Sequence, residues 1–115
     1  MKKVALYAFN GDPVCFIHVL LNALDMKEKG YDIKLIIEGS AARLVRVLAL
    51  PEAPLHKLYE KVKEEKLIDC VCKACASKMD STESAEEQGL PVWGDVNGHP
   101  GMAGYREKGY EIITF

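Results

Sequence analysis

The segment that decides the fold is Val4-Ala5-Leu6-Tyr7-Ala8-Phe9-Asn10-Gly11-Asp12-Pro13. Its first six residues form an apolar run without polar alternation, which is typical of a strand covered on both faces of a parallel sheet. Asp12 can then cap a helix and Pro13 can open it, because a first helical position has no use for the N–H that proline lacks. We expect this helix to run to about Lys29 and to stop at Gly30.

The rest of the chain repeats this alternation of strand and helix. Apolar runs predict further strands over residues 33–38, 67–72, 90–93 and 110–115, with helices between them and Ser40 as the cap of one short helix. Alternation over so few residues implies right-handed crossovers. We therefore predict a single-domain α/β protein, residues 1–115, with a three-layer flavodoxin-like fold and a mainly parallel sheet of about five strands.

Composition narrows the classes of function. The chain has 115 residues and a formal net charge of -2, and its basic residues are interleaved with acidic ones, so nucleic acid is not an expected partner. The apolar start is broken by Asn10-Gly11-Asp12, too early for a signal peptide, and no segment reaches the length of a membrane span. We expect a cytoplasmic protein whose thiols stay reduced and serve redox, sulfur or metal chemistry rather than disulfides.

Three of the four cysteines lie in Cys70-x-Cys72-x-x-Cys75, where the third strand runs into a helix. Cys75 is expected in the first helical turn, where free N–H groups and the helix dipole stabilise a thiolate. It is the first candidate for a catalytic thiol, with Cys72 as the alternative. Strand alternation places Cys70 on the same face as Cys72 and favours a packing role for Cys70. Cys15 is expected in the core.

Parallel sheets bind ligands beyond the carboxyl ends of their strands. The side chains and turns expected at those ends, and therefore predicted to line a substrate site, are Asn10, Gly11, Asp12, Glu38, Gly39 and Trp93. Asn10-Gly11-Asp12 offers backbone N–H groups at a helix start, but it has neither the glycine spacing of a dinucleotide motif nor the lysine of a P-loop.

Metal and dithiol chemistry are the alternatives at the cysteine segment. A structural zinc site needs about four ligands, usually in two paired clusters. Outside this segment only Cys15 and three single histidines remain; His18 is expected in the core or an interface, and His99 as the cap of the last helix. We therefore expect no metal and no other cofactor. The CxxC pair also lacks the surroundings of a thioredoxin-like motif.

The helix from Asp12 to Lys29 carries apolar residues on every side, more than one small domain can cover. We therefore expect a homo-oligomer.

Four segments together resemble the DsrE/DsrF-like family, and the likeness spans the whole chain: Val4–Phe9, Ile36–Gly39, Ala74–Met79 and Glu107–Ile113. The resemblance implies a small cytoplasmic α/β protein that assembles into trimers, hexamers or dimers. It also implies a cysteine that carries a persulfide from a sulfur donor protein to an acceptor protein. In the sulfur-relay branch that cysteine matches Cys72, and in the broader branch it matches Cys75.

The function expected from these observations is that of a sulfur carrier or sulfurtransferase subunit. The alternatives left open are a non-catalytic oligomeric scaffold or ligand-binding module of the same fold, and a metal-binding protein.

Overall fold

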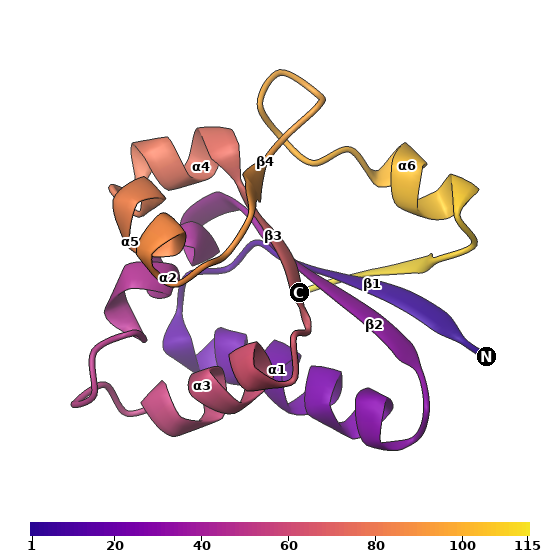
Figure 1. The fold of residues 1–115 in the computed structure, drawn as a ribbon, viewed down its shortest axis with the longest axis horizontal. Coiled ribbons are helices and arrows are strands. Elements are labelled where there is room, and N and C mark those ends of the chain that lie inside the picture. The colour runs from indigo at the N-terminus through magenta and orange to yellow at the C-terminus, as the bar shows by residue number, and fades with distance from the viewer.

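The sheet in the computed structural model, which describes residues 1–115, has five strands, and every neighbouring pair is parallel (Figure 1). The strands are β1 (Lys3–Ala8), β2 (Asp32–Ile37), β3 (Ile68–Cys72), β4 (Val92–Trp93) and β5 (Glu111–Thr114). Their order across the sheet is β4-β3-β2-β1-β5. The predicted α/β class, with its three-layer flavodoxin-like arrangement and parallel sheet, is confirmed.

The helices divide unequally between the two faces of the sheet. They are α1 (Pro13–Glu28), the 3-10 helix η1 (Gly39–Ala42), α2 (Arg43–Val47), α3 (His56–Glu64), α4 (Lys73–Lys78), α5 (Thr82–Glu87) and α6 (Met102–Glu107). Buried residues of α1 to α5 share one hydrophobic cluster, whereas Tyr105 of α6 packs with Tyr7 and Ile36 in a second cluster. Strands β1 to β4 are added in one direction and β5 in the other, so right-handed crossovers place α6 alone on the opposite face.

The first strand–helix joint forms as its sequence predicts. Asp12 has extended backbone angles, and its carboxylate accepts a hydrogen bond from the N–H of Val14 at 2.9 Å. Pro13 is the first helical residue, and Gly30 follows the helix with a φ of 89°. The helix start at Asp12 and Pro13 therefore determines where β1 ends. Because the strands are parallel, the later strands end at the same edge of the sheet.

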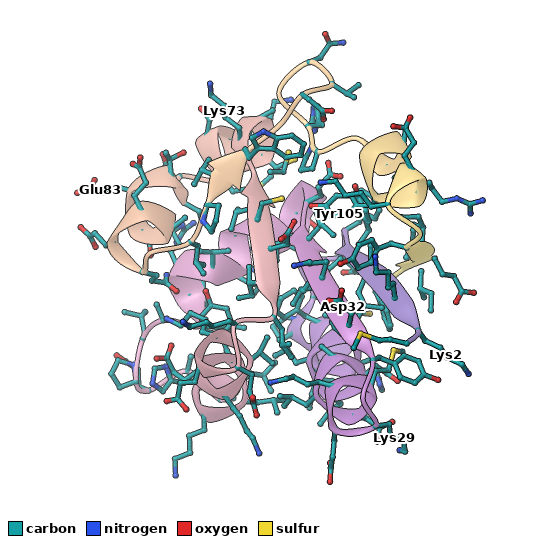
Figure 2. All side chains as sticks on the ribbon, turned by 45° about the vertical axis from the view of Figure 1, so that its right-hand side comes forward. Lys2, Lys29, Asp32, Lys73, Glu83 and Tyr105 are labelled. Atoms are coloured by element: carbon teal, nitrogen blue, oxygen red, sulfur yellow. The ribbon has the colours of Figure 1, made fainter.

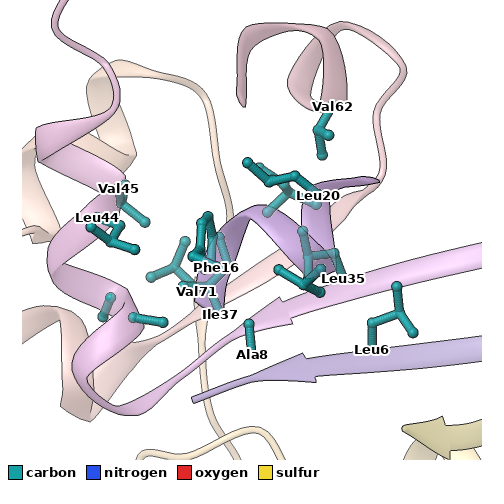
Figure 3. Close-up of a cluster of buried hydrophobic side chains, with 14 of the residues drawn as sticks. Leu6, Ala8, Phe16, Leu20, Leu35, Ile37, Leu44, Val45, Val62 and Val71 are labelled. Carbon is teal, nitrogen blue, oxygen red and sulfur yellow. The ribbon is translucent and has the colours of Figure 1, made fainter. Parts of the chain in front are cut away.

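The larger core lies between the sheet and α1 to α3 (Figure 3). Phe16 and Leu20 of α1 meet Leu35 and Ile37 of β2, and each of these side chains is at most 2% exposed. On the α6 face, the rings of Tyr7 and Tyr105 lie edge to face with their centroids 5.9 Å apart. The sheet therefore gives the strand ends a rigid support.

Two local expectations are wrong. Cys15, expected in the core, is exposed. His18 is exposed as well, which excludes the core and leaves the interface that the sequence also allowed. Apolar residues surround α1, so sequence alone does not decide which side faces the core. Ser40 does not cap a helix: it lies within η1, and its hydroxyl accepts the N–H of Gly11 at 2.8 Å and donates to the carbonyl of Phe9.

Candidate functional site

Four side chains from different parts of the chain meet at the carboxyl edge of the sheet: Glu38, Cys72, Cys75 and His99. Glu38 follows β2, Cys72 ends β3, Cys75 lies in the first turn of α4, and His99 lies in the loop after β4. Lys73, labelled in Figure 2, marks the start of α4 between the two cysteines. One potential ligand atom of each residue lies within 4.8 Å of the others. We call this group the Cys-His cluster.

His99 is the centre of the Cys-His cluster. Its Nδ1 lies 3.1 Å from Cys72 Sγ, 3.7 Å from Cys75 Sγ and 3.2 Å from Glu38 Oε1. The side chain of His99 is 47% exposed, whereas that of Glu38 is 8% exposed. One imidazole nitrogen therefore lies near both sulfurs and near the buried carboxylate of Glu38, which places His99 to exchange a proton with either thiol.

The two thiols share one kind of hydrogen-bond partner and differ in another. Cys75 Sγ accepts the backbone N–H of Gly39 at 3.1 Å. Cys72 Sγ also accepts an N–H, that of Cys75 at 3.4 Å, but it faces the carbonyl of Gly98 at 3.6 Å as a donor. Burial, the largest cause, raises the pKa of the Cys72 thiol. Burial and the Gly98 carbonyl therefore favour the neutral thiol of Cys72, whereas the backbone partner of Cys75 Sγ is an N–H donor.

A tight turn after β4 positions His99 beside the two cysteines. Asn97 and Gly98 have positive φ values of 51° and 85°, and Val96 and His99 close the turn with two backbone hydrogen bonds of 2.8 and 2.9 Å. The expectation that His99 caps the last helix is wrong. Gly101 occupies the N-cap of α6, so the imidazole is free to turn toward the cysteines.

Gly39 is required at its position by geometry. Its φ is 57°, and a Cβ atom there would lie 2.8 Å from the carbonyl oxygen of Phe9. This conformation points the Gly39 N–H at Cys75 Sγ. The glycine thus supplies the backbone donor that any larger residue would displace.

A cavity of about 280 Å³ opens beside Cys75. Its lining includes Gly39, His99 and the basic residue Lys78. Cys75 itself is 9% exposed, whereas Cys72 is fully buried. A small anionic or sulfur-bearing group entering this cavity would meet Cys75 first.

The predicted substrate-lining residues separate into three places. Glu38 and Gly39 lie at the Cys-His cluster. The others in the β1–α1 turn serve structure: Asn10 accepts the N–H of Asp12, Asp12 caps α1, and Gly11 packs against Ser40. None of these three lines the cavity beside Cys75.

Trp93 is 45% exposed and lies on a separate cavity of about 400 Å³, together with Cys70 and Tyr105. Cys70 and Cys72 do not share surroundings as strand alternation predicts: Cys70 packs with Tyr105 in the smaller cluster, and Cys72 with the larger one. Cys72 is the last residue of β3 and the N-cap of α4, so its side chain departs from the strand alternation that Cys70 follows. The register of β2 and β3 also shifts at Asp69, ahead of both cysteines, where β3 carries one extra residue. Burial raises the pKa of Cys70 to about 12, so this thiol is inert, which agrees with the predicted packing role.

Sequence reasoning missed His99 as a site residue. Its only local signal was the Asn97-Gly98 turn, which predicts a reversal of the chain but not what the next side chain meets. No helix has the length and apolar character that a membrane crossing requires.

Comparisons with known proteins give relatives without an assigned role. No protein-family model matches the chain. It is 37% identical over 97 residues to the uncharacterised protein MJ0733 of Methanocaldococcus jannaschii, across 84% of this chain and 77% of that protein. It is 48% identical over 40 residues, 35% of this chain and 66% of the relative, to an uncharacterised protein of Archaeoglobus fulgidus.

Among solved structures, a conserved protein of unknown function from Bacteroides thetaiotaomicron, BT1422, is similar with a TM-score of 0.74. The match covers 99% of this chain and 95% of that one at 14% identity. This likeness shows the fold alone.

Proposed function

We propose that this chain, which belongs to the same family as the uncharacterised protein MJ0733, is a sulfur carrier or sulfurtransferase subunit in which Cys75 holds a persulfide. The observation that carries the proposal is the position of Cys75 Sγ, which accepts the Gly39 N–H at 3.1 Å at the wall of a small cavity. The resemblance of Ala74–Met79 and Ile36–Gly39 to DsrE/DsrF-like proteins also supports persulfide transfer by a cysteine.

The loading step balances without an external oxidant. The Cys75 thiolate attacks the outer sulfur of a donor persulfide, R–S–SH. The S–S bond of the donor breaks, R–S⁻ leaves with the electron pair, and Cys75–S–SH forms. An acceptor thiolate then attacks the outer sulfur of Cys75–S–SH, and Cys75 returns as a thiolate.

The neighbours of Cys75 have distinct roles in this scheme. His99 Nδ1, at 3.7 Å from Cys75 Sγ, takes the thiol proton before attack, and Glu38 stabilises the imidazolium that results. Cys72 can attack the inner sulfur of Cys75–S–SH, which releases HS⁻ and forms a Cys72–Cys75 disulfide. Cys72 is thus the resolving thiol.

The test is intact-protein mass spectrometry of metal-free protein after incubation with glutathione persulfide. Wild-type protein is expected to gain one sulfur atom that a reductant removes, and Cys75→Ser to gain none. Cys15→Ser and Cys70→Ser are the controls and should load like wild type. Loading that survives Cys75→Ser, or that Cys72→Ser alone abolishes, would overturn the assignment of Cys75. If no single substitution matters, the scaffold alternative replaces the carrier.

The proposal includes a homo-oligomer and a cytoplasmic location. Val14 and Leu21, two turns apart on α1, are 72% and 47% exposed, with His18 between them on the same side. A second copy of the chain covering this stripe makes a homo-oligomer, and light scattering that gives the 12.8 kDa monomer at micromolar concentration would count against it. Four free cysteines suit the reducing cytoplasm.

A further inference from the structure

The Cys-His cluster also has the composition of a metal centre. Its side chains offer two sulfurs, one imidazole nitrogen and one carboxylate oxygen. Zinc takes these ligand types, almost always four at a time in structural sites. The sequence argued against zinc because its ligands stand singly along the chain, and the structure removes that reason by bringing Glu38 and His99 to the CxxC pair.

We propose that Glu38, Cys72, Cys75 and His99 together bind one Zn²⁺ ion. This inference goes beyond persulfide transfer and does not depend on it, because it concerns ligation by these side chains in the absence of any sulfur donor.

The separations of the ligand atoms suit tetrahedral coordination. Zinc–sulfur bonds of about 2.3 Å and zinc–nitrogen or zinc–oxygen bonds of about 2.0 to 2.1 Å place tetrahedral ligand atoms about 3.3 to 3.8 Å from one another. The distances from His99 Nδ1 to the other three ligand atoms are 3.1, 3.7 and 3.2 Å. All four atoms lie within 4.8 Å of one another, so small side-chain rotations complete the tetrahedron.

Backbone donors hold the two sulfurs in place. The Gly39 N–H is 3.1 Å from Cys75 Sγ, and the Cys75 N–H is 3.4 Å from Cys72 Sγ. Metal-bound cysteine is a thiolate, and such outer contacts orient ligands and offset part of their negative charge. The remaining charge suits a cation, because the buried carboxylate of Glu38 has no ion-pair partner except His99.

Zinc bound here would change both stability and reactivity. It would tie the β2–η1 turn, the β3–α4 junction and the loop that carries His99 to one another. It would also occupy Cys75 and Cys72 at once, so zinc and a persulfide donor would compete for the same sulfurs. A metal-bound form would therefore be protected from sulfur loading and from alkylation.

The test titrates Co²⁺ into the metal-free, 115-residue protein, with Zn²⁺ as the competitor. Stoichiometric Co²⁺ should produce a sulfur-to-cobalt charge-transfer band and intense visible bands of tetrahedral cobalt, and Zn²⁺ should abolish them. Cys72→Ser and Cys75→Ser should each weaken the charge-transfer band. His99→Ala should lower affinity by at least the roughly 10 to 100-fold that loss of an outer contact costs. Circular dichroism checks that each variant is folded, and the exposed His99 makes its variant the safest of the set.

Cys70→Ser is the matched control, since Cys70 lies two residues from Cys72 but outside the Cys-His cluster. It should bind cobalt like wild type. Binding that lacks the charge-transfer band, binding that survives both Cys72→Ser and Cys75→Ser, or no binding near neutral pH would overturn the metal site. The sulfur-loading experiment uses metal-free protein, so failure of one proposal leaves the other measurable.

Discussion

Gly39→Ala is expected to destabilise the fold more than the same change at a glycine in open surroundings. Gly39 has a φ of 57°, and a Cβ atom at this position would lie 2.8 Å from the carbonyl oxygen of Phe9. That oxygen cannot retreat freely, because it accepts hydrogen bonds from Ala41 N at 3.3 Å and from the hydroxyl of Ser40 at 3.2 Å. Gly89 is the control: its φ is 74°, and nothing lies within 4 Å of a Cβ built there.

The magnitude follows from two contributions. A left-handed conformation costs a residue with a Cβ about 1 to 2 kcal/mol, and the smaller entropy of the unfolded alanine chain offsets about 0.4 to 1 kcal/mol of this cost. Gly89→Ala should therefore lower the free energy of unfolding by about 1.6 kcal/mol or less. At Gly39 the contact with Phe9 adds an overpacking cost of about 1 to 3 kcal/mol.

The assay is urea unfolding of both variants under identical conditions, with the free energy of unfolding from linear extrapolation. Cys75 gives a second readout, because displacement of the Gly39 N–H should slow its alkylation relative to the exposed Cys15 in the same molecule. Equal losses of stability in Gly39→Ala and Gly89→Ala would refute the steric argument. An unchanged ratio of alkylation rates would refute the role of the Gly39 donor.

Three further outcomes test other parts of the structure. Phe16→Ala removes a side chain that is 2% exposed and should lower the free energy of unfolding by about 3 to 5 kcal/mol in a denaturant titration. Leu21 is 47% exposed, so Leu21→Ala should lower the free energy of unfolding by much less. Burial raises the pKa of Tyr59, so its contribution to stability is complete below the unfolded pKa of about 10 and is lost as pH rises. At pH 11 that loss is about 1.4 kcal/mol, and Tyr59→Phe should remove it from the difference in unfolding free energy between pH 9 and pH 11. Native-state alkylation at neutral pH should label Cys15 readily and spare Cys70 until the protein unfolds, and early labelling of Cys70 would contradict its 2% exposure.

Local sequence signals predict the strands and helices of this protein. The Asp12-Pro13 pair starts α1, Gly30 follows its end, and an unbroken apolar run marks β1. Each signal acts between residues that are neighbours along the chain, through capping bonds, fixed φ values or side-chain periodicity. Alternation of such elements was enough to predict a parallel α/β sheet, because the crossover rule leaves few other arrangements.

The Cys-His cluster depended on distant contacts that local signals do not encode. His99 is 27 residues from Cys72 and 61 from Glu38, and only the strand order β4-β3-β2-β1-β5 and the turn at Gly98 bring their side chains together. The exposure of Cys15 also depended on tertiary packing, because apolar residues surround α1 and do not specify which of its sides packs against the sheet. The sequence by itself determined the elements and the position of the cysteine segment at the junction of β3 and α4, since short-range forces set them. The tertiary structure decided the partners of the cysteines, because packing of the whole chain fixes which strand ends become neighbours.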